Sequence, residues 1–210
     1  VVAPDRERSG VAHGVTYMET MWVEPHEMNG VRAWVTSGTP ADCVRWGLAR
    51  QCEQIEQPDL VLSGINRGRN CGFHIFYSGT VAAALQAAAM GVRAVALSMD
   101  YDDLQNLPQV AEIATEIVFG QLLEAFDQPR MVLNVNVPPF DELESHEVLW
   151  THHSAVLEPE EFELETQDGE RHVYRARMGN FVEPEPGSDR WALQHGRISV
   201  TKLFCNLATP

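Results

Sequence analysis

The sequence predicts an α/β fold, in which a parallel sheet carries helices on both faces. Two observations indicate it. Short apolar runs, typical of buried parallel strands, alternate with helical patterns through the first part of the chain. Near residue 140 this alternation stops, and strand-like pieces separated by turn residues follow. We therefore expect an α/β core over residues 1–140 and a β-rich extension over residues 141–210.

The first forty residues should supply strands and the start of the first helix. Residues 1–4 are expected to end a strand that runs into a polar loop. Residues 15–23 alternate in polarity and predict a strand, and residues 31–36 predict another. Thr39 can cap a helix and Pro40 fits the first helical position, so a helix should begin there.

The central region carries the strongest strand and helix signals. Buried strands are predicted at residues 60–65, 93–99 and 131–137. Ser78-Gly79-Thr80 opens an alanine-rich helix that Gly91 ends. Because this helix has no charged residue, we expect it to be buried on all sides. An amphipathic helix is predicted at residues 109–126.

The extension is predicted from strand-like pieces that lie between turns. These pieces are residues 147–152, 172–177 and 197–203. Acidic residues crowd positions 158–165, and Pro184, Pro186 and Gly187 mark a loop. We expect this smaller, β-rich region to serve as an oligomerisation arm.

The composition argues against several classes of function. The 210 residues carry a formal charge of −15, which repels a phosphate backbone and disfavours a nucleic-acid duplex as partner. The sequence shows no run of roughly 18 apolar residues that could span a membrane, so we expect no membrane segment, and we expect no secretory leader. The four cysteines lack CxxC spacing and are expected to be free thiols in a cytoplasmic protein.

Three polar loops are expected at the carboxyl ends of strands, where open α/β sheets bind their ligands. They are residues 5–10, 37–40 and 66–80. Glycines let backbone N–H groups approach an anion, and a helix N-terminus adds unpaired donors. The arginine pairs Arg6 with Arg8 and Arg67 with Arg69 suit one phosphate-sized ligand better than a duplex. The loops therefore predict a phosphate site, with Ser78–Thr80 as its best-built part.

The candidate ligand-binding residues also have plainer roles. Ser78–Thr80 can be an ordinary helix cap. Asn66 can be a turn residue rather than a neutral oxygen ligand for a hard cation, and Ser9 an ordinary loop serine. His74 lies in the glycine-rich loop and could reach a ligand.

Paired histidines and asparagines in predicted strands have simpler interpretations. His152 and His153 are neighbours on a strand and point to opposite faces, so we expect surface histidines rather than a metal site. Asn134 and Asn136 are unusual in a core strand, and we expect them to hydrogen-bond to adjacent loops.

Several segments, taken in order along the chain, resemble the SurE survival-protein family. Val-Ala-Pro-Asp-Arg-Glu-Arg-Ser at residues 2–9 is similar to the family's VAPDxxRS loop, and His13 stands in the place of its usual histidine. Further similar segments are SGTPADCV at 37–44, SGINRGRNCG at 63–72, YSGTVAAA at 77–84, NVNVP at 134–138 and a closing strand at 189–201. Together, in one order, these motifs are specific, although each alone is not.

The resemblance implies a Rossmann-like core with a β-hairpin arm, assembled as a homodimer or homotetramer. It implies hydrolysis of nucleoside 5′-monophosphates at a divalent metal, Mg²⁺ or Mn²⁺, with 3′-nucleotides or polyphosphate as further substrates. The positions that match its metal ligands are Ser9 and Asn66. The positions that match its phosphate pocket are Asn70, Ser78, Gly79 and Thr80, with Ser37, Gly38 and Thr39 on the neighbouring loop.

The chain departs from the family pattern at the metal site. The family's adjacent aspartates end a first strand upstream of the VAPD loop, and this sequence shows no such motif. Asp102 and Asp103 are adjacent, but they follow a different strand. Two neutral ligands leave Mg²⁺ mostly to its own waters, so we expect residues 1–210 alone to hydrolyse little. The absent strand would be central, so we expect its neighbours to present unpaired edges and the fold to be weakened.

Other functions are compatible with parts of this pattern. A relative that has lost its metal site would be a non-catalytic nucleotide- or anion-binding protein. A dinucleotide enzyme is disfavoured because no GxGxxG motif follows a strand. Glycosyl transfer would rest on fold analogy alone.

Overall fold

The computed structural model describes residues 1–51, 57–100 and 104–205, and its main sheet has five strands. In order across the sheet they are β4 (Leu60–Arg67), β5 (Arg93–Met99), β6 (Met131–Val137), β10 (Ile198–Phe204) and β7 (Val148–Thr151). Strands β4, β5 and β6 run parallel, whereas β10 lies antiparallel to β6 and parallel to β7. All three apolar runs are therefore confirmed as strands; β5 and β6 are buried as predicted, whereas β4 has no fully buried residue.

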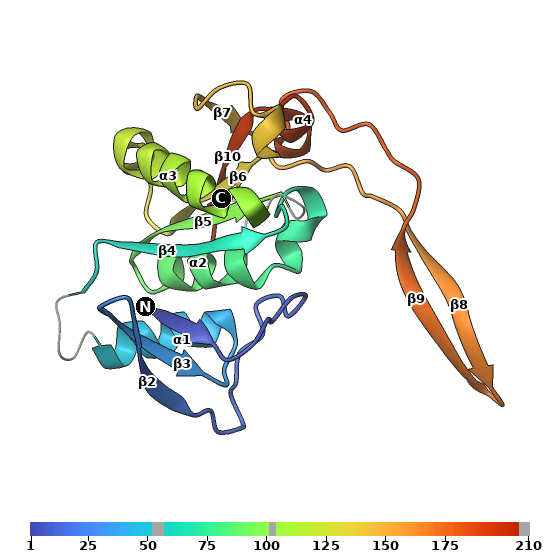
Figure 1. Ribbon diagram of the computed structural model, residues 1–210, viewed down its shortest axis with the longest axis horizontal. Coiled ribbons are helices and arrows are strands. Elements are labelled where there is room, and N and C mark those ends of the chain that lie inside the picture. The colour runs from blue at the N-terminus through green and yellow to red at the C-terminus, as the bar shows by residue number, and fades with distance from the viewer. Residues whose placement is uncertain (52–56, 101–103, 206–210) are drawn as a thin grey trace.

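Helices cover both faces of this sheet, as the sequence predicted (Figure 1). Because strand side chains alternate between faces, Ala94 and Ala96 of β5 pack with α2 (Gly79–Ala89), whereas Val95 and Leu97 pack with α3 (Leu107–Ile117). Helix α3 is extended by a π-helical turn (Val118–Leu122) and a short 3-10 turn (Leu123–Ala125). None of the described helices is long and apolar enough to cross a membrane.

A second, three-stranded sheet holds the beginning of the chain. Its strands are β1 (Val2–Pro4), β3 (Val31–Thr36) and β2 (Val23–Met28) in that order, and α1 (Pro40–Trp46) follows them along the chain. The strand predicted at residues 15–23 is wrong, because β2 begins at Val23. The Asn29–Gly30 turn sets that register: both residues have positive φ, as a tight hairpin turn requires, and strand β2 precedes the turn directly.

The two sheets meet at open strand edges. Among the described residues, β1 pairs only with β3, and β4 pairs only with β5. An apolar cavity of about 700 Å³ lies between these edges. It is lined by side chains of both strands, of helices α1 and α2 and of the π-helical turn (Gly47–Gln51) after α1, among them Val2, Val44, Leu48, Leu60 and Leu62. Because β4 is at the edge of its sheet and faces this cavity, the side chain of Leu62 is 45% exposed, although leucine is usually buried in a strand of this kind.

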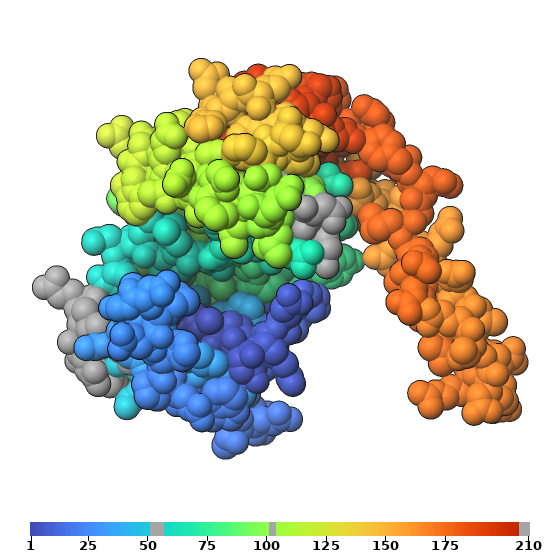
Figure 2. Space-filling view, in the orientation of Figure 1, coloured from blue at the N-terminus to red at the C-terminus, as the bar shows by residue number. Residues whose placement is uncertain are grey.

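A two-stranded hairpin projects from the body of the molecule (Figure 2). We call it the arm; it consists of β8 (Glu160–Asp168) and β9 (Arg171–Met178), and every residue of both strands is exposed. The sequence predicted β9 but not β8, whose many acidic residues are unfavourable in strands. The short helix α4 (Asp189–Gln194) was also missed. Strands β7 and β10, from the same extension, belong to the main sheet.

The cysteines described by the structure are free, as expected. They are Cys43, Cys71 and Cys205, whereas Cys52 lies outside the described residues. Burial raises the pKa of the Cys43 and Cys71 thiols to about 12, and so both stay protonated and unreactive at neutral pH.

Candidate active site

A cavity of about 680 Å³ opens where β1 and β4 end and α2 begins. This is the carboxyl edge of the parallel strands, where the sequence predicted a ligand. The candidate residues that line it together are Ser9, Asn66, Asn70, Ser78, Gly79 and Thr80. Segments more than fifty residues apart in the chain thus contribute to one site.

Helix α2 points its first turn into this cavity. The Ser78 Oγ accepts a hydrogen bond from the Val81 N–H (3.1 Å), which fixes the start of the helix. Gly79 allows the close approach of the neighbouring loop, because a Cβ there would lie 2.9 Å from Cγ of Pro40. The first N–H groups of a helix have no intrahelical acceptor, so this turn presents donors to an anion.

Asn66 is the second-last residue of strand β4 and does not follow the strand. Its amide orders the surrounding loop. The Nδ2 group donates to the carbonyl of Gly68 (2.7 Å), and Oδ1 accepts from the Thr80 hydroxyl (3.2 Å). The turn role considered for Asn66 is therefore present, and the same side chain also joins β4 to the start of α2 at the cavity wall.

Asn70 anchors the glycine-rich loop to the sheet through a buried network. Its N–H donates to Oδ1 of Asn136, and its Nδ2 donates to the hydroxyl of Ser98, both at 2.7 Å. Its carbonyl accepts from the amides of Asn134 and Asn136, so these strand asparagines bond to the adjacent loop as expected. The Asn70 side chain therefore faces the sheet, and Ser98 is a supporting residue that sequence reasoning missed because it resembles any other strand serine.

The residues predicted on the neighbouring loop stand behind the cavity rather than in its wall. Ser37, Gly38 and Thr39 are absent from its lining. The Ser37 carbonyl accepts a hydrogen bond from the guanidinium of Arg8, which does line the cavity. Thr39 caps α1. In this structure the loop positions Arg8 and the start of α1.

Asp42 ties this loop together from within α1. Its carboxylate, 1% exposed, accepts hydrogen bonds from the N–H groups of Thr16 and Thr39 and from Arg45. Burial alone would raise the pKa of Asp42, but these hydrogen bonds outweigh it and hold that pKa below its ordinary value. The carboxylate is therefore a stable anion at neutral pH.

The positive charges predicted as two separate pairs meet at this one cavity. Arg6, Arg8, Arg67 and Arg69 all line it, in a molecule whose formal charge is −15. A local group of guanidinium ions in an acidic protein attracts a small anion without attracting a polyanion. Charge and backbone donors therefore both indicate a phosphate-sized ligand.

The foot of the arm forms the outer wall of the cavity. Glu160 and Met178, which pair across β8 and β9, line it together with His74 and Tyr77. His74 also pairs with Glu158 (3.1 Å). Sequence reasoning named His74 alone of these, because nothing local indicates that residues a hundred positions apart share a wall.

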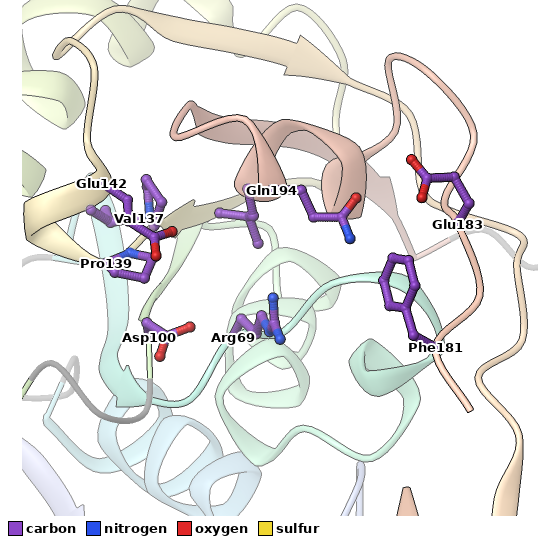
Figure 3. A pocket seen from close by; sticks show the side chains of 10 residues that line it. Arg69, Asp100, Val137, Pro139, Glu142, Phe181, Glu183 and Gln194 are labelled. Carbon is purple, nitrogen blue, oxygen red and sulfur yellow. The ribbon is translucent and has the colours of Figure 1, made fainter. Parts of the chain in front are cut away.

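A second cavity of about 570 Å³ shares Arg69 with the first (Figure 3). Its lining includes the carboxylates of Asp100, Glu142 and Glu183, and the ring of Phe181 lies on the same side of the cavity as Glu183. Three carboxylates against one guanidinium repel an anion. With four arginines against Glu7 and Glu160, the first cavity is therefore the better candidate for a phosphate site.

The remaining histidines lie elsewhere. His13 hydrogen-bonds to Gln86 (3.1 Å) and does not line the cavity. His152 is exposed, as expected, but the expectation of a surface residue is wrong for His153. That ring is half-buried and packs edge-on against Phe73 and Phe76, because β7 ends beside the turn that carries these two rings.

Comparison with known proteins decides the family. The sequence profile of "Survival protein SurE" matches residues 1–157. The chain belongs to the SurE family. A protein named 5′-nucleotidase SurE from Prochlorococcus marinus (strain NATL2A) is 38% identical over 165 residues, which are 77% of this chain and 62% of that protein. A protein of the same name from Desulfitobacterium hafniense (strain DSM 10664 / DCB-2) is 32% identical over 208 residues, 99% of this chain and 80% of that protein.

The fold agrees with this membership. The crystal structure of the SurE protein from Aquifex aeolicus matches with a TM-score of 0.76 and 31% identity, over 99% of this chain and 82% of that chain. The chain spans less than two thirds of the length of the Prochlorococcus relatives that it matches. The Rossmann-like architecture inferred from the motifs is therefore shown.

The described residues of this SurE chain do not by themselves fit a divalent metal. They contain no group of three or more His, Cys, Asp and Glu side chains that could hold one. Ser9 and Asn66 supply two neutral oxygens at the cavity, whereas a hard cation prefers charged ones. Asp102 and Asp103 lie outside the described residues.

Proposed function

We propose that this protein is a phosphomonoesterase that releases phosphate from nucleoside 5′-monophosphates. The observation that carries the proposal is the convergence of the α2 N-terminus, Thr80 and four arginines on one cavity. The relatives named 5′-nucleotidase SurE support the same reaction class.

In this proposal the chain's own residues hold and orient the phosphate. The N–H groups at the first turn of α2 donate to the phosphoryl oxygens, and the Thr80 hydroxyl lies beside them. The arginines neutralise part of the charge, as guanidinium groups do for phosphates. The buried anchor at Asn70 keeps the loop rigid, so these donors need little rearrangement when a substrate binds.

We further propose that activity requires Mg²⁺ or Mn²⁺, with Ser9 and Asn66 as its neutral ligands. A bound divalent ion supplies charge neutralisation and an activated water in such reactions. Its charged ligands would have to come from beyond the described residues. The cavity between β1 and β4 shares Pro4, Pro40, Gly64 and Thr80 with the site cavity, so a strand filling that gap would end at the site.

The test is phosphate release from a panel of nucleotides with Mn²⁺, with and without EDTA. Measured on the full-length gene product, we expect release from AMP that EDTA abolishes. The variant Asn66→Ala should lose most of this activity, whereas His13→Ala, outside the cavity, should keep it. Residues 1–210 alone should release little phosphate, and full Mn²⁺-dependent activity of that fragment would contradict the proposed need for further ligands.

One observation favours a second candidate, a non-catalytic nucleotide- or anion-binding protein. The described residues bring four arginines and a helix N-terminus to one cavity but supply no carboxylate cluster for a metal. Such a protein would bind AMP in a calorimetric titration and release no phosphate with any divalent ion. The same preparation therefore distinguishes the two functions.

We propose that the arm docks onto a second copy of this chain. Alternation along β8 and β9 places Phe162, Leu164, Tyr174 and Met178 on one face, and all four are between 47% and 65% exposed. The other face carries ion pairs such as Arg177 with Glu163. A two-stranded hairpin is only marginally stable alone, and an exposed apolar face marks an interaction surface.

Oligomeric state tests this second part of the proposal. Light scattering after gel filtration should show a homodimer or homotetramer. Replacing Phe162 and Tyr174 by serine should shift it toward the monomer, whereas Glu163→Gln on the other face should not. A wild-type monomer at micromolar concentration would contradict the docking role.

A further inference from the structure

A smaller cavity continues the candidate active site beneath the foot of the arm. It measures about 260 Å³ and shares four lining residues with the site cavity. The shared residues are His74, Tyr77, Glu160 and Met178. A molecule held by its phosphate at the α2 N-terminus can therefore extend past these residues into the smaller cavity.

The walls of the smaller cavity suit a flat, partly apolar group. The side chains of Phe73, Leu157, Pro159 and Met178 line it, and Tyr77 stands at its junction with the site cavity. The Tyr77 side chain is 53% exposed, so its ring is accessible to a ligand. Aromatic rings and methionine sulfur stack well on planar heterocycles, which have a π-face whatever their substituents.

The smaller cavity has two carboxylates in its lining, and they differ in their hydrogen bonding. Both carboxylate oxygens of Glu158 already have a partner, since Oε1 accepts from Arg190 (2.6 Å) and Oε2 pairs with His74 (3.1 Å). Glu160, in contrast, has no hydrogen bond or ion pair to its carboxylate within the described part of the chain. A carboxylate accepts hydrogen bonds and cannot donate one when ionised, so Glu160 favours a ligand group that carries N–H bonds.

The foot of the arm is held in place before any ligand binds. Arg190, 7% exposed, also donates to the carbonyls of Val156 and Val182. These carbonyls lie on the segments that enter and leave the arm, so one guanidinium fixes both. A subsite between Tyr77 and the arm is therefore preformed, which reduces the entropy lost on binding.

We propose that the base of the nucleotide binds between Tyr77 and the foot of the arm, with Glu160 accepting a hydrogen bond from an exocyclic amino group. This assignment rests on the proposed function for the position of the phosphate. It selects nucleotides whose base carries an amino group. AMP is preferred to IMP, which has a carbonyl oxygen at the same ring position and would face the carboxylate with a second acceptor.

Equilibrium binding tests this subsite without requiring catalysis. Calorimetric titration of the full-length gene product should give a Kd for AMP roughly tenfold or more below that for ribose 5-phosphate, which lacks the base. Tyr77→Ser should remove most of that difference, and Tyr77→Phe, which keeps the ring, should retain it. Equal affinities for the two probes, or an equal loss of both in Tyr77→Ser, would overturn the assignment.

A second pair of variants tests the selectivity. Wild-type protein should bind AMP roughly fivefold more tightly than IMP, the effect of about one hydrogen bond to a charged group at an open site. Glu160→Gln can donate to the IMP carbonyl and should abolish or invert this ratio. Glu161→Gln, on the opposite face of β8, should leave it unchanged. An unchanged ratio in Glu160→Gln would refute the role of Glu160.

Phosphate release measured in parallel distinguishes a failure of the proposed enzyme function from a failure of the proposed base subsite. If AMP binding depends on Tyr77 but no nucleotide is hydrolysed, the proposed enzyme function is wrong and the base subsite stands. If AMP and ribose 5-phosphate are hydrolysed with equal kcat/KM by wild type and by Tyr77→Ser, the enzyme function stands and the base subsite is wrong.

Discussion

The main sheet and the arm differ in how their strands are covered. Strands β5 and β6 lie inside the main sheet, whereas β8 and β9 of the arm are open to solvent. In β6 every residue is buried, and in β8 and β9 every residue is exposed. Strand β6 obtains its neighbours from within the chain, through β5, β10 and the helices on both faces. The arm has only its own hairpin pairing. The described chain therefore leaves the apolar face of the arm exposed.

The difference shows where each region gains its stability. A buried strand is held by tertiary packing, so its side chains are sensitive to small changes in volume. An exposed hairpin is held mainly by its turn and by cross-strand pairs, each worth about 0.2–1 kcal/mol. The candidate site lies between the two, since the sheet holds its glycine-rich loop and the arm supplies its outer wall.

Truncating one leucine in each region should give the largest contrast. Leu133 is fully buried between β5 and β10, so Leu133→Ala should lower the free energy of unfolding by about 2–5 kcal/mol. Leu164→Ala on the arm, at a side chain 47% exposed, should change the stability of the monomer by less than about 0.5 kcal/mol. Urea unfolding curves of both variants measure this at dilutions where light scattering shows the monomer, and similar losses there would show that the arm packs on its own chain.

The segments that join the main sheet to the arm should be nearly as sensitive to substitution as the core. Asp189, at 0% exposed, accepts hydrogen bonds from the N–H groups of Gly72, Ser154 and Arg190. Asp189→Ala should leave these donors unpaired and cost about 2–4 kcal/mol in the same assay. Asp168→Ala, at the exposed end of β8, is the matched control and should cost little. A small loss for Asp189→Ala would mean that water replaces the carboxylate.

Acidification should destabilise the body of the molecule through Asp42. The hydrogen bonds that hold the pKa of Asp42 below its ordinary value stabilise the fold above the unfolded pKa. That contribution is lost as pH falls below about 4 through the folded pKa. The urea midpoint of wild type should therefore fall more steeply between about pH 5 and pH 2 than that of Asp42→Asn. Parallel curves would remove Asp42 from the explanation.

The smallest effect is expected on the charged face of the arm. Arg177 and Glu163 pair at 3.0 Å, with side chains 59% and 62% exposed. Exposed ion pairs contribute about 0–1 kcal/mol, so Arg177→Gln should shift the thermal midpoint by no more than about 2–3 °C. A larger shift would indicate that this face is also covered by a partner in solution.

The sequence determined the α/β alternation, because strands and helices that pack in a core have characteristic local patterns of apolar residues. The apolar runs of β4, β5 and β6 and the capped start of α2 at Ser78 are visible without tertiary information. The asparagines of β6 were visible as anomalies, since an amide in a core strand requires a partner. The loops with Ser9, Asn66 and Thr80 were identified by their motifs, and the structure brings them to one cavity.

The tertiary structure alone decided what these residues share. Strand β2 is set by the Asn29–Gly30 turn and by pairing with β3, which outweighed the weak alternation at residues 15–23. The meeting of four arginines at one cavity, and the arrival of Glu160 and Met178 from the arm, depend on contacts between distant segments. Local patterns record which side chains must be buried, but not which of them become neighbours. That choice is made by the packing of the whole chain.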